Sequence, residues 1–227
     1  MNAPLPLLAV VQGLLERTYG IPGGLIDAGR FVVCDHGYRR FYGGAPTPTA
    51  VGAADGQGAR TLVREASDGL RAAIYYPDAL IRRLEQYPPQ HGLCEQNVDA
   101  FATLVEEVDH LLLLAERYRN DRPVTQFEME LQANISKHLV LIRYLAGNAR
   151  LLDEPSRLWL AHHLFEKVRY ADEDPAVRAR YRDAAGWAVR FLKVLRPMPA
   201  GARTESLRAF HAADSAGKVE LTHRLAA

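Results

Sequence analysis

The amino-acid sequence predicts an α+β fold, with a small antiparallel sheet followed by helices that continue to the C-terminus. Segments that alternate polar and apolar residues lie within the first 95 residues, whereas apolar residues after about residue 95 recur at helical spacing. Strands followed by a run of helices are typical of proteins whose helices pack on one side of a sheet. We therefore expect an N-terminal part, 1–95, and a helical part, 96–227, joined in one compact unit.

The N-terminal part is predicted to hold one long helix, a few strands and a short helix. Glycine and proline runs separate these segments, and Asp68-Gly69 predicts a tight turn between two strands. A stretch rich in Gly, Pro, Ala and Thr predicts a flexible loop. In chain order we expect a helix over 5–19, a strand at 30–34, a loop over 43–59, strands at 60–67 and 70–76, and a helix over 78–86.

The helical part contains four predicted helices and a less regular C-terminal end. Pro155 and Pro175 each follow an acidic residue and stand in the first turn of a predicted helix, where proline is favoured. The predicted helices run near 95–118, 124–146, 154–170 and 175–195, followed by a loop over 197–204 and a last helix over 205–224.

Composition narrows the classes of function. The 227 residues include 28 Lys and Arg against 27 Asp and Glu, so no strong field favours nucleic acid or an anionic membrane. No stretch reaches the ~20 apolar residues of a membrane span, and the first residues lack the basic start and cleavage site of a signal peptide. Two distant cysteines, Cys34 and Cys94, indicate reduced thiols in a cytoplasmic protein.

The most informative segment is LVEEVDHLLLLAER, residues 104–117, inside the helix predicted near 95–118. Glu106 and His110 are one turn apart and lie on one face of a helix, so both can bind one ion. Glu107 lies about 100° further round, beside that ion, where a general base is required. Because the helix is otherwise apolar, its polar groups are costly to bury unless they are paired or bound to a cation.

A third candidate ligand lies on the next predicted helix, 124–146. Glu130 follows His110 by 20 residues, and Asn134 lies one turn beyond Glu130 on the same face. If the two helices meet, the side chains of Glu106, His110 and Glu130 point into one pocket.

This pattern resembles the gluzincins, the thermolysin-like zinc peptidases, over roughly residues 60–145. These enzymes carry H-E-x-x-H on one helix and a ligand glutamate on the next, and one turn later an aspartate that hydrogen-bonds the first histidine. Here the motif is the degenerate E-E-x-x-H. The resemblance implies a zincin-like fold with Glu106, His110 and Glu130 as metal ligands, Glu107 as catalytic base and Asn134 as the supporting residue behind the ligands.

Two departures from the family pattern are mutually consistent. Glu106 replaces a histidine, and Asn134 replaces the aspartate that would otherwise face another carboxylate. An asparagine removes that repulsion and can donate a hydrogen bond. The resulting set of two carboxylates and one imidazole suits one divalent ion, either Zn or, with its added oxygen, Mn or Fe.

The resemblance implies metal-assisted hydrolysis of a peptide-like bond, with a peptide-like or small-molecule ligand in the cleft. Three alternatives stay open. The chain can be a catalytically inactive zincin-like domain that acts as a binding or structural module. Glu106 and Glu107 can instead face solvent on an ordinary helix, with His110 satisfied by a neighbour. The two E-x-x-H pairs, Glu107 with His110 and Glu220 with His223, can also belong to a ferritin-like di-iron helical protein.

Overall fold

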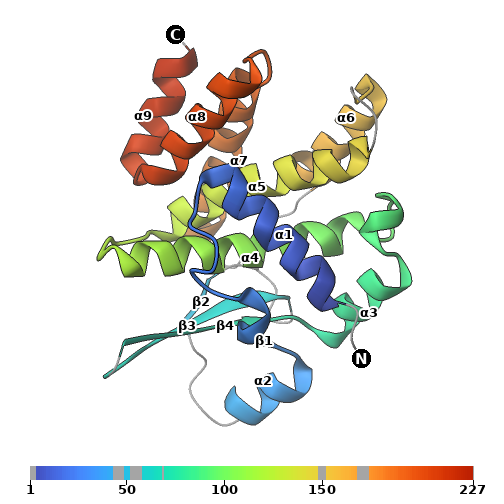
Figure 1. Ribbon diagram of the computed structural model, residues 1–227, viewed down its shortest axis with the longest axis vertical. Helices are drawn as coiled ribbons and strands as arrows, with labels where there is room; N and C mark the ends of the chain where they lie inside the picture. Colours follow the sequence, from blue (N-terminus) through green and yellow to red (C-terminus); the bar gives the residue numbers. More distant parts are fainter. Residues whose placement is uncertain are drawn as a thin grey trace.

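The computed structural model describes residues 4–42, 49–51, 58–67, 69–147, 152–167 and 174–226. The architecture is α+β, as the sequence predicts. A small sheet lies along one side of α4 (Val98–Arg119) (Figure 1). The C-terminal helices lie on the opposite side; they are α7 (Pro175–Leu195), α8 (Ala200–Ala212) and α9 (Ser215–Ala226). The long central helices therefore separate the strands from the end of the chain.

Within the described residues, the sheet has four strands in the order β1-β4-β3-β2. The predicted hairpin is confirmed, because β3 and β4 pair in antiparallel register with Thr61 opposite Ile74. The expectation of a purely antiparallel sheet is wrong, since β1 runs parallel to β4 and places Val32 beside Ile74. The strands are β1 (Val32–Val33), β2 (Thr49–Val51), β3 (Arg60–Ala66) and β4 (Gly69–Tyr75).

The loop predicted over 43–59 and the turn predicted at Asp68-Gly69 both lie partly outside the described residues. The predicted loop 43–59 lies mostly outside the described residues, but its segment 49–51 forms β2 beside β3, which corrects the prediction for that part. Asp68 of the predicted turn also lies outside the described residues. Gly69 has a φ of 131°, a backbone conformation that side-chain-bearing residues rarely adopt.

Three helices belong to the N-terminal part: α1 (Pro4–Tyr19), α2 (Asp35–Tyr42) and α3 (Asp78–Gln86). Two of them were predicted, whereas α2 was not, because its eight residues, DHGYRRFY, include no aliphatic residue and contain a glycine, which is a poor helix former. The strand expected at 30–34 is reduced to two residues, because a 3₁₀ turn occupies Ala28–Phe31.

The helices α4 (Val98–Arg119) and α5 (Gln126–Ala146) form an antiparallel pair. A short link joins them, in which Asp121 adopts a φ of 50°, tolerated by a short polar side chain. The hydroxyl of Thr125 caps α5 by accepting a hydrogen bond from the Glu128 N–H at 3.1 Å. The link therefore places the beginning of α5 beside the second half of α4.

The C-terminal region differs from its prediction. Helix α6 (Glu154–Ala161) continues into a π-helical turn at His162–Glu166, and α7 spans Pro175–Leu195 as expected. The loop expected at 197–204 extends only over 197–199, because α8 (Ala200–Ala212) begins earlier than predicted. The single helix expected at 205–224 is divided between the rest of α8 and a separate helix, α9 (Ser215–Ala226). The carboxylate of Asp214 accepts the Gly217 N–H at 2.8 Å and starts the second helix.

A buried ion network ties the C-terminal helices to the central pair. Arg117 on α4 donates to the Glu128 carboxylate on α5 at 2.7 Å and to the backbone carbonyl of His211 at 2.6 Å. The Lys218 ammonium on α9 lies 3.5 Å from the same carboxylate. The apolar core is continuous from Leu7 on α1 to Leu221 on α9. None of the described helices combines the length and apolar character that crossing a membrane requires.

Candidate metal centre

The α4–α5 pair brings the three predicted ligands together. The Nε2 atom of His110 lies 3.8 Å from Oε1 of Glu130 and 4.0 Å from Oε1 of Glu106. One ligand atom from each residue lies within 4.8 Å of the other two. Of the described residues, only this Glu106–His110–Glu130 cluster groups three such side chains closely enough to hold one metal ion.

His110 is completely buried, and its ring has no hydrogen-bond partner in the part of the chain that the structure describes. Neither Nδ1 nor Nε2 meets a partner among the described residues, and the exposed fraction of the residue is 0%. Burial lowers the pKa of His110 to about 4, so the ring is neutral at neutral pH. A neutral imidazole with a free nitrogen is the form that binds a metal ion. This finding contradicts the alternative in which a neighbouring side chain satisfies His110.

The two carboxylates of the cluster differ in protonation. Burial opposes the ionisation of Glu106, but the charge of Lys137 and its hydrogen bond hold the pKa of Glu106 below its ordinary value. The Lys137 ammonium lies 2.9 Å from Oε2 of Glu106. Burial and the nearby Glu106 charge raise the pKa of Glu130 well above its usual range. In the absence of a metal, Glu106 therefore loses its proton more readily than Glu130 does.

Glu107 is held beside the cluster by the sheet. Its exposed fraction is 1%, which contradicts the alternative in which this residue faces solvent. The hydroxyl of Thr61, on β3, donates to Oε2 of Glu107 at 2.8 Å. Burial and the neighbouring Glu106 charge raise the pKa of Glu107 well above its usual range. The strand thus fixes one oxygen of a carboxyl group that readily holds a proton.

Asn134 lies on the predicted face of α5, and 7% of it is exposed. Its side-chain amide donates to the backbone carbonyl of Glu130 at 2.9 Å. Asn134 thus contacts the turn of α5 that carries the ligand Glu130. The sequence pattern instead predicted that Asn134 supports the side chain of Glu106, which lies on α4.

Four residues near the cluster escaped the sequence analysis: Thr61, Lys137, Arg180 and Tyr181. Lys137 lies seven residues after Glu130, two turns along the same face of α5, so helical spacing contains a signal for it. Arg180 and Tyr181 come from α7. Burial and the Glu106 charge raise the pKa of Glu130, and the Arg180 charge opposes part of this rise. Burial and the charges of Glu130 and Glu106 raise the pKa of Tyr181. No local motif marks these two.

Other acid and histidine pairs in the sequence do not join the cluster. Glu220 and His223 lie exposed on α9, where the ring of His223 packs against Trp187 with centroids 4.8 Å apart. His163 contacts Glu95 and Asp99 through its two different nitrogens, at 3.0 and 3.4 Å. Opposite edges of one ring cannot bind the same ion, so this group is an ion-pair network.

The donor set fits a divalent cation. Ligands about 2 Å from one tetrahedral ion lie about 3.3 Å from each other, so the observed separations need only a small inward movement of the side chains. The unpartnered imidazole is buried, the two carboxyl groups face it, and one solvent-facing side remains at Glu106, whose side chain is 19% exposed. No protein-family model, curated protein or solved structure matches the chain.

Proposed function

We propose that this protein is a zincin-like, metal-dependent hydrolase of peptide-like bonds, in which Glu106, His110 and Glu130 bind one divalent ion. The observation that carries the proposal is the buried imidazole of His110, which has no hydrogen-bond partner among the described residues and faces two carboxyl groups. A buried polar group without a partner costs about 1–3 kcal/mol. A bound Zn, Mn or Fe ion removes that cost.

The chain's own residues supply the remaining parts of a hydrolytic site. A divalent ion held by these three side chains would polarise a substrate carbonyl and acidify a water molecule. Glu107 is the general base, because Thr61 occupies its Oε2 and leaves Oε1 to accept a proton. Its raised pKa suits a group that takes a proton from water and returns it to a leaving amine. Asn134 holds the helix turn behind Glu130.

One observation favours a second candidate, a catalytically inactive zincin-like domain that serves as a binding or structural module. The Lys137 ammonium lies 2.9 Å from Glu106 and supplies a positive charge to a ligand that a metal would otherwise neutralise. Within the described residues no second metal cluster accompanies the first, so the di-iron alternative gains no support. For either candidate we place the protein in the cytoplasm, where Cys34 and Cys94 stay free.

Replacement of Glu107 with glutamine separates the two candidates. The wild-type protein and the variant are purified, loaded with Zn or Mn, and assayed on a mixture of fluorogenic peptides. We expect the variant to retain the metal and lose at least about 100-fold in hydrolysis, the scale on which a general base contributes. A matched control is Glu116→Gln, which changes an acid on the same helix that contacts His211 instead of the cluster.

Each outcome of this assay decides one point. Stoichiometric metal without peptide hydrolysis in the wild-type protein overturns the hydrolase and supports the inactive domain. Absence of metal binding overturns the hydrolase and leaves the inactive domain, in which the Lys137 ammonium neutralises Glu106. Equal hydrolysis by the wild-type protein and the Glu107 variant overturns the role of Glu107.

A further inference from the structure

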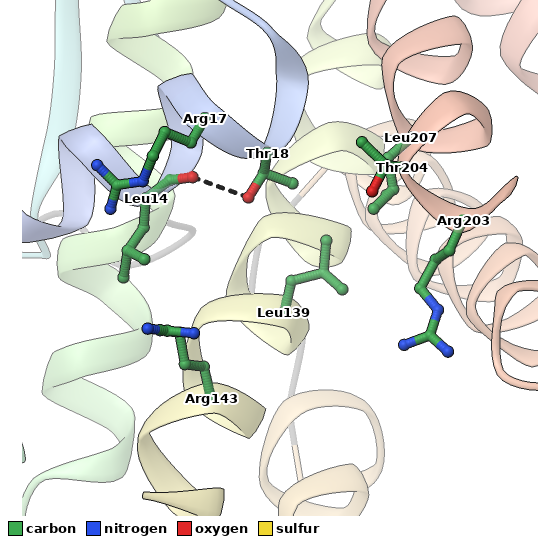
Figure 2. A pocket seen from close by; sticks show the side chains of 8 residues that line it. All are labelled: Leu14, Arg17, Thr18, Leu139, Arg143, Arg203, Thr204 and Leu207. Carbon is green, nitrogen blue, oxygen red and sulfur yellow. Dashed lines mark hydrogen bonds between the residues drawn. The ribbon is translucent and has the colours of Figure 1, made fainter. Parts of the chain in front are cut away.

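A separate hollow of about 490 Å³ lies between α1, α5 and α8, outside the metal centre (Figure 2). Three arginines line it, one from each helix: Arg17, Arg143 and Arg203. No acidic residue is among the lining residues, which otherwise comprise Leu14, Thr18, Leu139, Thr204 and Leu207. Its volume falls within the ~300–1,000 Å³ of small-molecule sites.

The arginine side chains lie on two sides of this basic hollow. In Figure 2 the guanidinium groups of Arg17 and Arg143 lie on one side, near Leu14, and that of Arg203 lies on the other. Within the described part of the chain, the side chains of Arg17 and Arg143 form no ion pair and no hydrogen bond to any group. Arg203 has one contact, a hydrogen bond to the Met198 carbonyl at 2.9 Å. Most of the guanidinium donors are therefore free for a ligand.

Helix dipoles explain only part of this arrangement. Arg17 and Arg143 lie in the last turns of α1 and α5, where a positive charge is favourable. Arg203 lies at the opposite end of its helix, close to the positive end of the α8 dipole, and no acidic residue is present in that first turn. An anion in the hollow would compensate a charge that the fold leaves uncompensated.

The two threonines that line the hollow already donate their hydroxyl hydrogens within their own helices, so the arginines are the hydrogen-bond donors left for a ligand. The hydroxyl of Thr18 donates to the Leu14 carbonyl at 2.8 Å, and that of Thr204 donates to the Ala200 carbonyl at 3.0 Å. Each hydroxyl hydrogen is thus already used within its own helix. Planar guanidinium groups bind phosphate and carboxylate with paired hydrogen bonds, so the arginines determine the ligand class.

We propose that the basic hollow binds a small organic molecule that carries at least two anionic groups, phosphate or carboxylate, with its apolar portion against Leu14, Leu139 and Leu207. Separate guanidinium groups on two sides of the hollow match an anion with charges at two points. The leucines provide an apolar floor for the body that joins them. This site does not depend on the proposed hydrolase activity.

Calorimetric titration of the full chain with inorganic pyrophosphate and, separately, with citrate tests the proposal. We expect at least one probe to bind in a 1:1 ratio, and pyrophosphate or citrate alone would identify phosphate or carboxylate as the preferred group. Arg143→Gln and Arg203→Gln should each weaken binding about tenfold or more, as expected for loss of a charge-assisted hydrogen bond. The matched control is Arg82→Gln, an exposed residue on α3 away from the hollow.

Three results would overturn the proposal. The first is the absence of binding by both probes at millimolar concentration in low salt. The second is an equal loss of affinity in Arg82→Gln and the two hollow variants, which would indicate a diffuse charge effect. The third is unchanged binding by the double variant Arg143→Gln, Arg203→Gln. Circular dichroism of each variant verifies that it is folded.

Discussion

Replacement of His110 with leucine should stabilise the metal-free protein and abolish its response to a divalent cation. The imidazole is fully buried, and neither nitrogen has a hydrogen-bond partner among the described residues. Leucine has a similar volume and no polar atom, so the cost of burying two unpartnered nitrogens disappears. An ordinary structural histidine would show the opposite behaviour, because its replacement would break hydrogen bonds.

The size of the effect follows from the environment of the ring. An unsatisfied buried polar group costs about 1–3 kcal/mol, and leucine exceeds histidine in helix propensity by a few tenths of a kcal/mol. Imperfect packing of the new side chain offsets part of this gain. We expect a net increase of about 1–2 kcal/mol in the free energy of unfolding. In a chain of this size that corresponds to a rise of roughly 2–8 °C in Tm.

The assay is thermal unfolding of chelator-treated protein, followed by the same measurement with Zn or Mn. A cation at 100 times its Kd should add about 2.7 kcal/mol to the wild-type protein and nothing to the variant. His163→Leu is the matched control, because His163 is also buried but contacts Glu95 at 3.0 Å. This control should be destabilised and should keep its response to the metal.

Two results would refute the reasoning about His110. Destabilisation of metal-free His110→Leu by more than about 1 kcal/mol would mean that the imidazole has a structural partner. An equal rise in Tm with metal in the variant and the wild-type protein would mean that the ion binds elsewhere.

Three further predictions concern charges. Lys137→Met should strengthen metal binding about tenfold, since it removes a cation 2.9 Å from Glu106; titration calorimetry measures this. Glu128→Gln should lower the free energy of unfolding by about 3 kcal/mol in urea, because two buried cations lose their shared carboxylate. Burial lowers the pKa of His138 to about 4 from 6.5. The unfolded chain therefore binds this proton first, so the wild-type protein should lose roughly 2 kcal/mol relative to His138→Gln between pH 7 and pH 4.5.

Matched controls accompany these three experiments. Lys193→Met, at an exposed position on α7, should leave metal affinity unchanged, and weaker binding in the Lys137 variant would contradict the competition argument. Glu154→Gln removes the acid of an exposed pair with Arg196 and should change stability by less than about 0.5 kcal/mol. For His138, a stability difference from the glutamine variant that is the same at both pH values would show that the ring is not buried in its neutral form.

The parts of the fold that sequence could predict are those governed by local pattern. The β3–β4 hairpin follows from alternation of polar and apolar residues, and α7 follows from Asp174-Pro175 at its start, where the aspartate accepts the Ala176 N–H. The beginning of helix α8 was predicted as a loop because Ala-Gly-Ala at this position has the composition of a loop. Its stability comes from tertiary contacts, including the Arg117 and Lys218 hydrogen bonds to carbonyls at its end.

In the candidate site, too, some residues follow from local sequence spacing and others only from the assembled fold. Glu106 and His110 share a face because of helical spacing, and Glu130 joins them because the α4–α5 link is short. Thr61 on β3 reaches Glu107 through sheet packing, which no spacing within one helix encodes. Arg180 comes from α7, fifty residues after Glu130, so only the assembled fold brings it near the cluster.

Anomalous diffraction from crystals soaked with Zn or Mn would locate a bound ion without reference to activity. We expect one strong peak per chain, about 2 Å from a ring nitrogen of His110 and from one carboxylate oxygen each of Glu106 and Glu130. Crystals without a peak at this position, or with the ion bound by other residues while the imidazole stays unpartnered, would contradict this expectation.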